Sequence, residues 1–230
     1  MSVPPVRPGA PGLDDPAVRS VLTRLYAQAE RADKEVMERA YAHAAELPAP
    51  PTAEQASALC ADALLPVDPH IGRLLYTLTR MLRPRGVVEF GTSFGTSAIQ
   101  IAAALRDNGG GRLITCELDA GKVRRARENI AEAGLADLVT VLEGDARDTL
   151  AGLTQPVELI LLDGWKELYL PVLQVLEPAM ADGAVIVADN LSMLPEEYLR
   201  HVRDPERGYV SLDLPLGDGV EITTWTRGTA

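Results

Sequence analysis

Four polar side chains follow two apolar segments of the chain, and their types suit a divalent cation beside a proton acceptor. Asp163 and Lys166 come directly after one apolar segment, and Asp189 and Asn190 come directly after the next. If these segments are adjacent parallel strands, roughly 4.8 Å apart, their terminal side chains converge. Two carboxylates and one amide suit an octahedral Mg²⁺ or a similar divalent cation. Such a cation lowers the pKa of a bound hydroxyl, whose proton Lys166 could accept.

A purely structural interpretation stays open for the same residues. Polar side chains often cap strand ends and helix N-termini, and Lys166 could lie on the surface or pair with Glu167. The three histidines show no spacing typical of zinc ligands; they are His43, His70 and His201.

Bringing the four side chains together requires a parallel sheet, and the second half of the chain predicts one. Short apolar runs alternate with helical stretches, and the runs are continuously apolar, as in strands covered on both faces. Two final segments flank a Gly-Asp-Gly turn and predict an antiparallel hairpin. The predicted strands are 87–90, 112–118, 139–142, 157–162, 184–188, 209–214 and 221–226, with helices at 96–106 and 120–133.

The first 64 residues predict a helical extension. Residues 1–15 are rich in proline and are expected to form a flexible tail. Apolar residues at three- and four-residue steps predict a helix over 17–47, with a break near Asp33 left open, and a second helix from Thr52. We therefore expect an extension at 16–64, acting as a lid, a dimer contact or ordinary packing, and a cofactor-binding domain at 65–230.

A glycine turn after the first predicted strand indicates a ligand site. Gly91 follows the strand and Gly95 opens the next helix, so the backbone can approach a ligand closely, although a turn without ligand has the same pattern. Glu117 ends the second strand and Asp145 follows the third, where they could bind a ribose and an adenine. Ser93 stands where a dinucleotide fingerprint has glycine, which disfavours a pyrophosphate.

Composition excludes several other classes of protein. The chain has 230 residues, 47% of them hydrophobic, and a formal net charge of −11 with no Lys/Arg-rich run, so no nucleic-acid partner is expected. No apolar run reaches the roughly 18 residues of a membrane span. With two cysteines and no apolar leader at the N-terminus, a cytoplasmic location is expected.

The segment from Glu89 to Ser97, Glu-Phe-Gly-Thr-Ser-Phe-Gly-Thr-Ser, resembles motif I of the class I methyltransferases, specifically the catechol and caffeoyl-CoA O-methyltransferase group. The match extends over about 65–190 and includes Leu-Asp-Gly-Trp-Lys and Ala-Asp-Asn after the fourth and fifth strands. The resemblance implies a Rossmann-like methyltransferase fold, S-adenosylmethionine and Mg²⁺ as cofactors, a homodimer, and a small hydroxylated substrate.

The resemblance also implies a role for each site residue. Contacts to the methionine part come from Glu89, Gly91, Ser93 and Ser97. The ribose contact is Glu117, and Asp145 and Ala146 lie near adenine. The cation is held by Asp163, Asp189 and Asn190, and Asp163 also lies beside the cofactor. Lys166 and Asp163 form the catalytic pair. Trp165 could form a substrate wall or core packing, and Asp213 lies near the position of a late acidic substrate contact. Position 164 is glycine where relatives have a larger residue, so a contact from that side chain is lost.

The preferred hypothesis is Mg²⁺-assisted O-methylation of a catechol-like vicinal diol. Three alternatives stay open: methylation of another N or O acceptor, a non-catalytic binding module with the same fold, and, last, a nicotinamide dehydrogenase.

Overall fold

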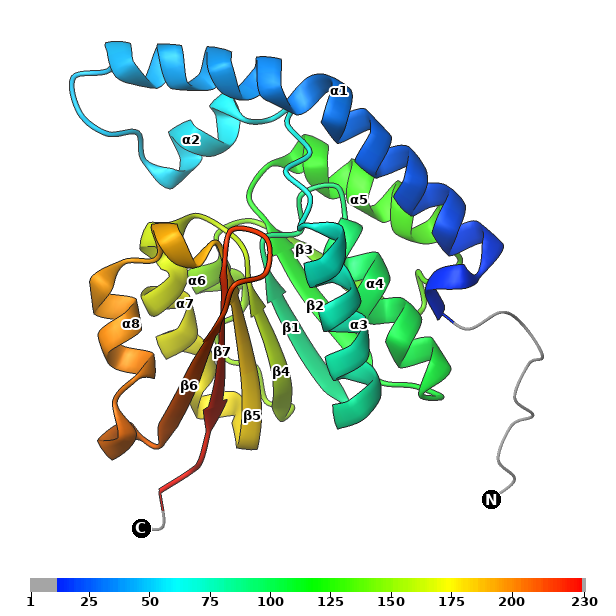
Figure 1. The fold of residues 1–230 in the computed structure, drawn as a ribbon, viewed down its shortest axis with the longest axis vertical. Coiled ribbons are helices and arrows are strands. Elements are labelled where there is room, and N and C mark those ends of the chain that lie inside the picture. Colours follow the sequence, from blue (N-terminus) through cyan, green and yellow to red (C-terminus); the bar gives the residue numbers. More distant parts are fainter. Residues whose placement is uncertain (1–11, 229–230) are drawn as a thin grey trace.

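A computed structural model describes residues 12–228, which form one seven-stranded sheet with helices on both faces (Figure 1). The strand order is β3-β2-β1-β4-β5-β7-β6; β7 is antiparallel to both of its neighbours, and the other pairings are parallel. The predicted fold class, including the C-terminal hairpin, is confirmed. The strands are β1 (Gly86–Phe90), β2 (Arg112–Glu117), β3 (Val139–Glu143), β4 (Val157–Leu162), β5 (Met180–Asp189), β6 (Tyr209–Leu214) and β7 (Val220–Trp225).

Alternate side chains of each central strand enter two separate apolar layers. Val87 and Leu159 pack on one face against α1, α3, α4 and α5, whereas Val88 and Ile160 pack on the other against α7 and α8. Each such side chain, fully buried, stabilises the fold by roughly 1.5–3 kcal/mol. The two layers fix the sheet, so its carboxyl edge is a rigid platform. The helices are α1 (Pro16–Glu46), α2 (Ala53–Leu59), α3 (Pro69–Leu82), α4 (Thr96–Asp107), α5 (Ala120–Glu132), α6 (Ala146–Thr149), α7 (Tyr169–Leu176) and α8 (Glu196–Val202).

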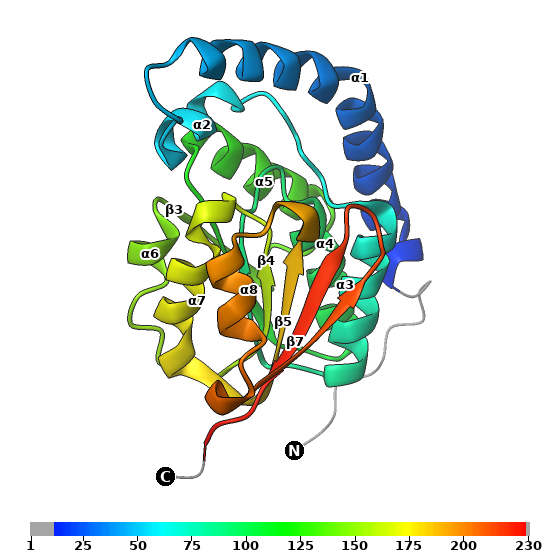
Figure 2. The ribbon, with the colours of Figure 1, turned by 60° about the vertical axis from the view of Figure 1, so that its left-hand side comes forward.

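The N-terminal extension is a long helix that overhangs the carboxyl edge of the sheet. Helix α1 runs unbroken for 31 residues, so the interruption considered near Asp33 is wrong. Its first half packs on the domain, and its second half projects beyond the domain and carries α2 back over the strand ends (Figures 1 and 2). We call residues 33–63 the arm. A small apolar cluster of Val36, Ala40, Cys60 and Ala63 holds its two helices together.

Part of the predicted flexible tail is ordered. Gly12–Asp14 forms a single 3₁₀ turn, and the Asp15 side chain caps α1 by accepting hydrogen bonds from two backbone N–H groups, at Ala17 and Val18. The flexible tail is therefore wrong for residues 12–15, and residues 1–11 lie outside the described part. Across residues 12–228, no helix is both long and apolar enough to cross a membrane.

The end of the arm is held by one half-buried carboxylate, that of Asp33, and this gives a first prediction. Asp33 accepts hydrogen bonds from the N–H groups of Leu64 and Leu65, each at 2.8 Å, while Leu65 holds a left-handed φ of 45°. A left-handed backbone conformation is costly for any residue with a side chain, such as leucine. The two hydrogen bonds from Asp33 offset this strain. We expect Asp33→Ala to cost about 1–3 kcal/mol locally. Hydrogen exchange at Leu64 and Leu65 should then accelerate, whereas Asp62→Ala, an exposed neighbour, should leave it unchanged.

Candidate active site

In the turn after β1, the backbone of Gly91 packs directly against the backbone at the end of β4. Gly91 has a φ of 103°, and a Cβ there would lie 2.3 Å from the backbone oxygen of Asp163. Only glycine allows this approach of β1 to the end of β4. Gly95 opens α4 with a φ of 87°, and Ser93 between them has a φ of 44°. The turn therefore forms a tight loop with a helix N-terminus behind it, as the spacing of the two glycines predicts.

Glu89, in β1, holds this turn in place through hydrogen bonds beneath it. Its side chain is fully buried, and it accepts hydrogen bonds from the hydroxyls of Ser97 and Thr115. Burial raises the pKa of Glu89 to about 7, although the two hydroxyls oppose the rise. Glu89 therefore binds Ser97 and Thr115 beneath the loop, and these hydrogen bonds support the loop from inside.

The raised pKa of Glu89 predicts how stability depends on pH. The folded state keeps the Glu89 proton up to about pH 7, whereas the unfolded chain loses it near its ordinary value of 4.5. Between these values the folded state binds more protons, so its stability falls as pH rises, by about 3 kcal/mol in all. Glu89→Gln should remove this slope. Urea unfolding at pH 5 and pH 8 measures it; equal slopes for the two proteins would contradict the assignment.

Ser93 links the turn to the end of β2 and to the segment after the arm. Its N–H donates to Glu117 at 2.8 Å, and its hydroxyl donates to the backbone oxygen of Leu64 at 2.6 Å. The other carboxylate oxygen of Glu117 accepts from the N–H groups of Leu118 and Asp119. Three backbone donors therefore fix this carboxylate at the strand end, where free lone pairs remain for further donors. The Leu64 contact holds the segment that follows the arm against the turn.

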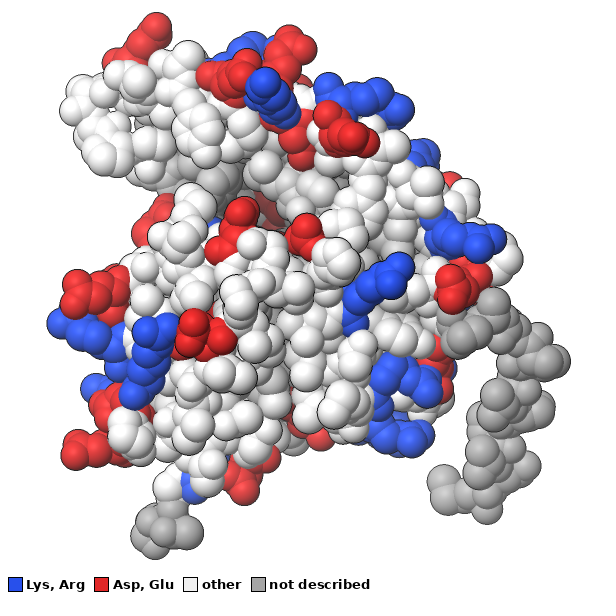
Figure 3. All heavy atoms as spheres, in the orientation of Figure 1, with Lys and Arg blue, Asp and Glu red and all other residues white. Residues whose placement is uncertain are grey.

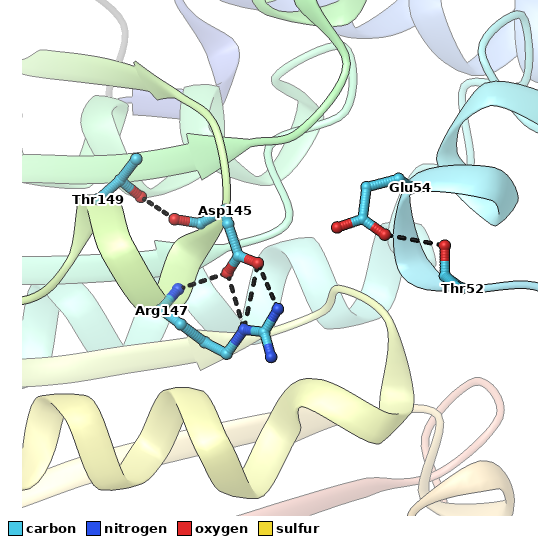
Figure 4. A network of polar contacts seen from close by, with 5 residues as sticks. All are labelled: Thr52, Glu54, Asp145, Arg147 and Thr149. Atoms are coloured by element: carbon cyan, nitrogen blue, oxygen red, sulfur yellow. Dashed lines mark hydrogen bonds and ion pairs between the residues drawn. The ribbon is translucent and has the colours of Figure 1, made fainter.

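Asp145 follows β3 and caps the short helix α6. Its carboxylate accepts the Arg147 N–H and a bidentate pair from the Arg147 guanidinium, whose hydrogen bonds lower the pKa of Asp145 (Figure 4). Glu54 of the arm faces this pair across a gap. A narrow pocket opens beside Asp145, and its lining is mainly apolar and aromatic. It is lined by Phe90, Cys116, Leu118, Gly144, Asp145, Ala146, Trp165 and Leu168.

Three of the four polar side chains predicted at the ends of β4 and β5 lie together, and Asn190 directly follows Asp189. Lys166 Nζ lies 3.7 Å from Asp163 Oδ1. Asp189 is close enough for its negative charge to repel that of Asp163. Burial raises the pKa of Asp163, the neighbouring Lys166 amine opposes the rise, and the charge of Asp189 adds to it. Asp189 Oδ1 accepts the N–H of Asn190, which turns with a left-handed φ of 60°. Parallel pairing of Leu162 with Ala188 places the two strand ends at one level.

A tyrosine that the sequence analysis did not single out holds Lys166. The Lys166 amine donates to the Tyr169 hydroxyl at 2.7 Å, and that hydroxyl donates to the backbone oxygen of Asp189 at 3.3 Å. Burial lowers the pKa of Lys166, while Asp163 and Asp189 oppose the change. The amine is thus held between both strand ends. Its position three residues before Tyr169 on a helical turn is the signal that could have found this contact.

The buried carboxylates suit a cation by their chemistry. Asp163 and Asp189 place two carboxylates at a poorly solvated edge of the sheet, and among residues 12–228 Lys166 is the one cation that pairs with either of them within 4 Å. A divalent cation would relieve this excess, and the Asn190 amide adds a neutral oxygen. Within the described residues no cluster of three or more His, Cys, Asp or Glu side chains is placed to hold a metal, so any site depends on two carboxylates and the amide.

Asp213 does not join this group. It is exposed on the edge strand β6, opposite Glu221, and its charge acts on Arg203 beside α8.

Two further acidic residues lie near Asp189. Burial raises the pKa of Asp189, and the negative charges of Asp218 and Asp68 raise it further. In the sequence Asp218 stands out only as part of a turn, and no pattern singles out Asp68. Figure 3 shows acidic side chains around the hollow beneath the arm.

Trp165 lies between the pocket and the arm. It lines the pocket beside Asp145 and also packs against the apolar cluster of the arm around Cys60. Its contacts with the arm agree with the core-packing interpretation, and a role as a substrate wall stays a prediction.

Comparisons with known proteins agree with this geometry. Residues 88–191 match a family model described as a methyltransferase domain. The catechol O-methyltransferase of Sus scrofa is 33% identical over 147 residues, 58% of this chain and 77% of that protein. Catechol O-methyltransferase B of Danio rerio is 35% identical over 149 residues, 61% of this chain. The match covers 55% of the Danio rerio protein, so the chain spans about half the length of several curated relatives.

Solved structures support the fold. The O-methyltransferase TomG from Streptomyces achromogenes, solved with SAM, has a TM-score of 0.61 at 24% identity, covering 87% of this chain and 99% of that one. An O-methyltransferase from Bacillus cereus, solved with SAH, has a TM-score of 0.63 at 22% identity, covering 80% of this chain and 96% of that one. On the match to the Sus scrofa protein above all, this chain belongs to the catechol O-methyltransferase family of S-adenosylmethionine-dependent methyltransferases.

Proposed function

We propose that this protein transfers a methyl group from S-adenosylmethionine to a hydroxyl of a small molecule, with a catechol-like vicinal diol as the preferred acceptor and Mg²⁺ as a second cofactor. The observation that carries the proposal is the convergence of Asp163, Lys166 and Asp189 beside the glycine turn. The donor and acceptor sites adjoin, because the Gly91 backbone touches the backbone of Asp163.

The chain's own residues supply binding, orientation and a proton acceptor. Glu117 is fixed to accept the ribose hydroxyls, and the loop from Gly91 to Gly95 would carry the methionine part. Asp163, Asp189 and Asn190 would hold the cation, which when bound lowers the pKa of a substrate hydroxyl. Lys166, whose amine burial makes less basic, would take the hydroxyl proton. Transfer is an in-line displacement, so alignment by these elements supplies much of the rate.

The arm is proposed to act as a lid over the acceptor. It overhangs the carboxyl edge, contacts Trp165 through its apolar cluster, and is tied to the turn by the path from Asp33 through Leu64 to Ser93. A lid in this place would exclude water from the reacting hydroxyl. Homodimer formation and a cytoplasmic location stay predictions based on the resemblance and the composition.

A binding titration tests the donor half of the proposal. Calorimetry should show one site for S-adenosylhomocysteine on the wild-type protein and no binding of NAD. Binding of NAD instead would assign the turn to a dehydrogenase, and no binding of either would favour a non-catalytic module.

A chelator tests the metal half. Methyl transfer to a diol should fall by at least tenfold in EDTA and return on adding excess Mg²⁺, because the cation activates the hydroxyl. Undiminished transfer in chelator would remove the metal from the mechanism and leave the methyltransferase assignment standing.

A further inference from the structure

The ring of Phe90 lines the pocket beside Asp145, and it fits there because residue 164 is glycine. Phe90, the last residue of β1, lines the pocket together with Trp165 and is 6% exposed. A Cβ built on Gly164 would lie 2.3 Å from Cζ of the Phe90 ring, far inside van der Waals contact. The ring and a side chain at position 164 therefore exclude one another.

We propose that Phe90 forms the aromatic wall against which the adenine of the cofactor packs, in place of a side chain at position 164. This inference rests on the proposed function, because it presumes a nucleoside cofactor. Gly164 directly follows Asp163, so a larger residue there would point its side chain into the space that the Phe90 ring now fills. The absence of a side chain at 164 is thus matched by an aromatic residue one strand away.

The surroundings of the ring suit a purine. Cys116, Leu118 and Leu168 give the pocket apolar sides, and Asp145 gives it one carboxylate. A purine presents flat apolar faces and an exocyclic amine at its edge, which match aromatic walls and a carboxylate acceptor. In the present structure Arg147 engages that carboxylate, but a carboxylate has lone pairs for further donors.

The ring is also held in a fixed orientation. Phe90 meets Tyr169 edge to face, with centroids 6.1 Å apart and planes at 76°. Tyr169 in turn accepts the hydrogen bond from Lys166. The Phe90 ring therefore contacts both the pocket and Tyr169, which binds Lys166. A ring at this position can orient the nucleoside relative to Asp163 and Lys166.

The test measures affinity for S-adenosylhomocysteine and for adenosine by calorimetry. Phe90→Met keeps an apolar side chain of similar length without a ring, and it should weaken both ligands by about three- to tenfold, as expected for loss of an aromatic contact. Phe90→Leu/Gly164→His should regain most of the affinity by supplying a ring from the other position. Gly164→His alone should lower the melting temperature, because Phe90 occupies its space.

The outcomes separate the inference from the proposed function. If the wild-type protein binds neither ligand, the proposed function fails. If it binds both and Phe90→Met binds them equally well, the inference fails alone. A loss that affects S-adenosylhomocysteine but not adenosine also overturns it, since the ring would then act away from the base. Should Phe90→Met fail to fold, the double variant still decides, because a folded double variant without affinity contradicts the exchange of rings.

Discussion

Asp163→Asn should abolish methyl transfer while leaving the fold and most of the cofactor affinity in place. The substitution keeps the shape of the side chain but removes the charge that lies 3.7 Å from the Lys166 amine and acts on Asp189. Loss of a cation ligand and of the partner of the proton acceptor should lower kcat by at least about a hundredfold. Steady-state assays with a labelled methyl donor measure this loss.

A matched control lies four residues away. Glu167 is an exposed carboxylate next to Lys166, so Glu167→Gln removes the same charge without entering the site. It should leave kcat within about twofold, as expected for a surface substitution. If Asp163→Asn lost S-adenosylhomocysteine binding as completely as turnover, Asp163 would belong chiefly to the cofactor site and the assignment of the strand-end cluster would be wrong.

Glu117→Gln should weaken binding of S-adenosylhomocysteine strongly, by about ten- to a hundredfold. Three backbone N–H groups hold the carboxylate in place, so its free lone pairs are aimed and the ribose hydroxyls meet a charged acceptor. A hydrogen bond to a charged group contributes about 1.5–3 kcal/mol, and an amide cannot accept at both ends. The dissociation constant from calorimetry is the measurement.

The control for this prediction is a variant of Glu143, at the end of the neighbouring strand β3. Glu143 pairs in register with Glu117 across β2 and β3, and its side chain is exposed. Glu143→Gln should leave the affinity unchanged. Equal affinity for Glu117→Gln and the wild-type protein would show that the ribose is not bound at the end of β2.

The sheet and its strand ends could be predicted because local patterns determine them. The continuously apolar runs match β1 to β5 within a few residues, and the convergence of Asp163 with Asp189 follows from parallel pairing alone. Thr52 begins α2 with the capping geometry that its residue type favours. The roles of the site residues toward cofactor, cation and substrate stay predictions.

Contacts between distant segments could not be predicted in the same way. The Asp33 carboxylate reaches N–H groups more than 30 positions along the chain, and no local pattern marks it. The Phe90 ring fills the space above Gly164 only because β1 and β4 are neighbours. Asp213 was singled out by the resemblance alone, as lying near a late acidic substrate contact, and on the edge strand β6 it is exposed to solvent.

The most direct test of methyl transfer to a vicinal diol is mass spectrometry of the acceptor after incubation with S-adenosylmethionine and Mg²⁺. A panel should pair each vicinal-diol phenol with the same phenol lacking one hydroxyl, because two oxygens are needed to hold the acceptor beside Asp163 and Asp189. We expect the diols to gain one methyl group and their partners to gain none. Absence of methylation across the panel, with S-adenosylmethionine recovered intact, would rule out the proposed methyl transfer. Methylation of the single-hydroxyl phenols at the same rate would contradict the proposed diol chemistry.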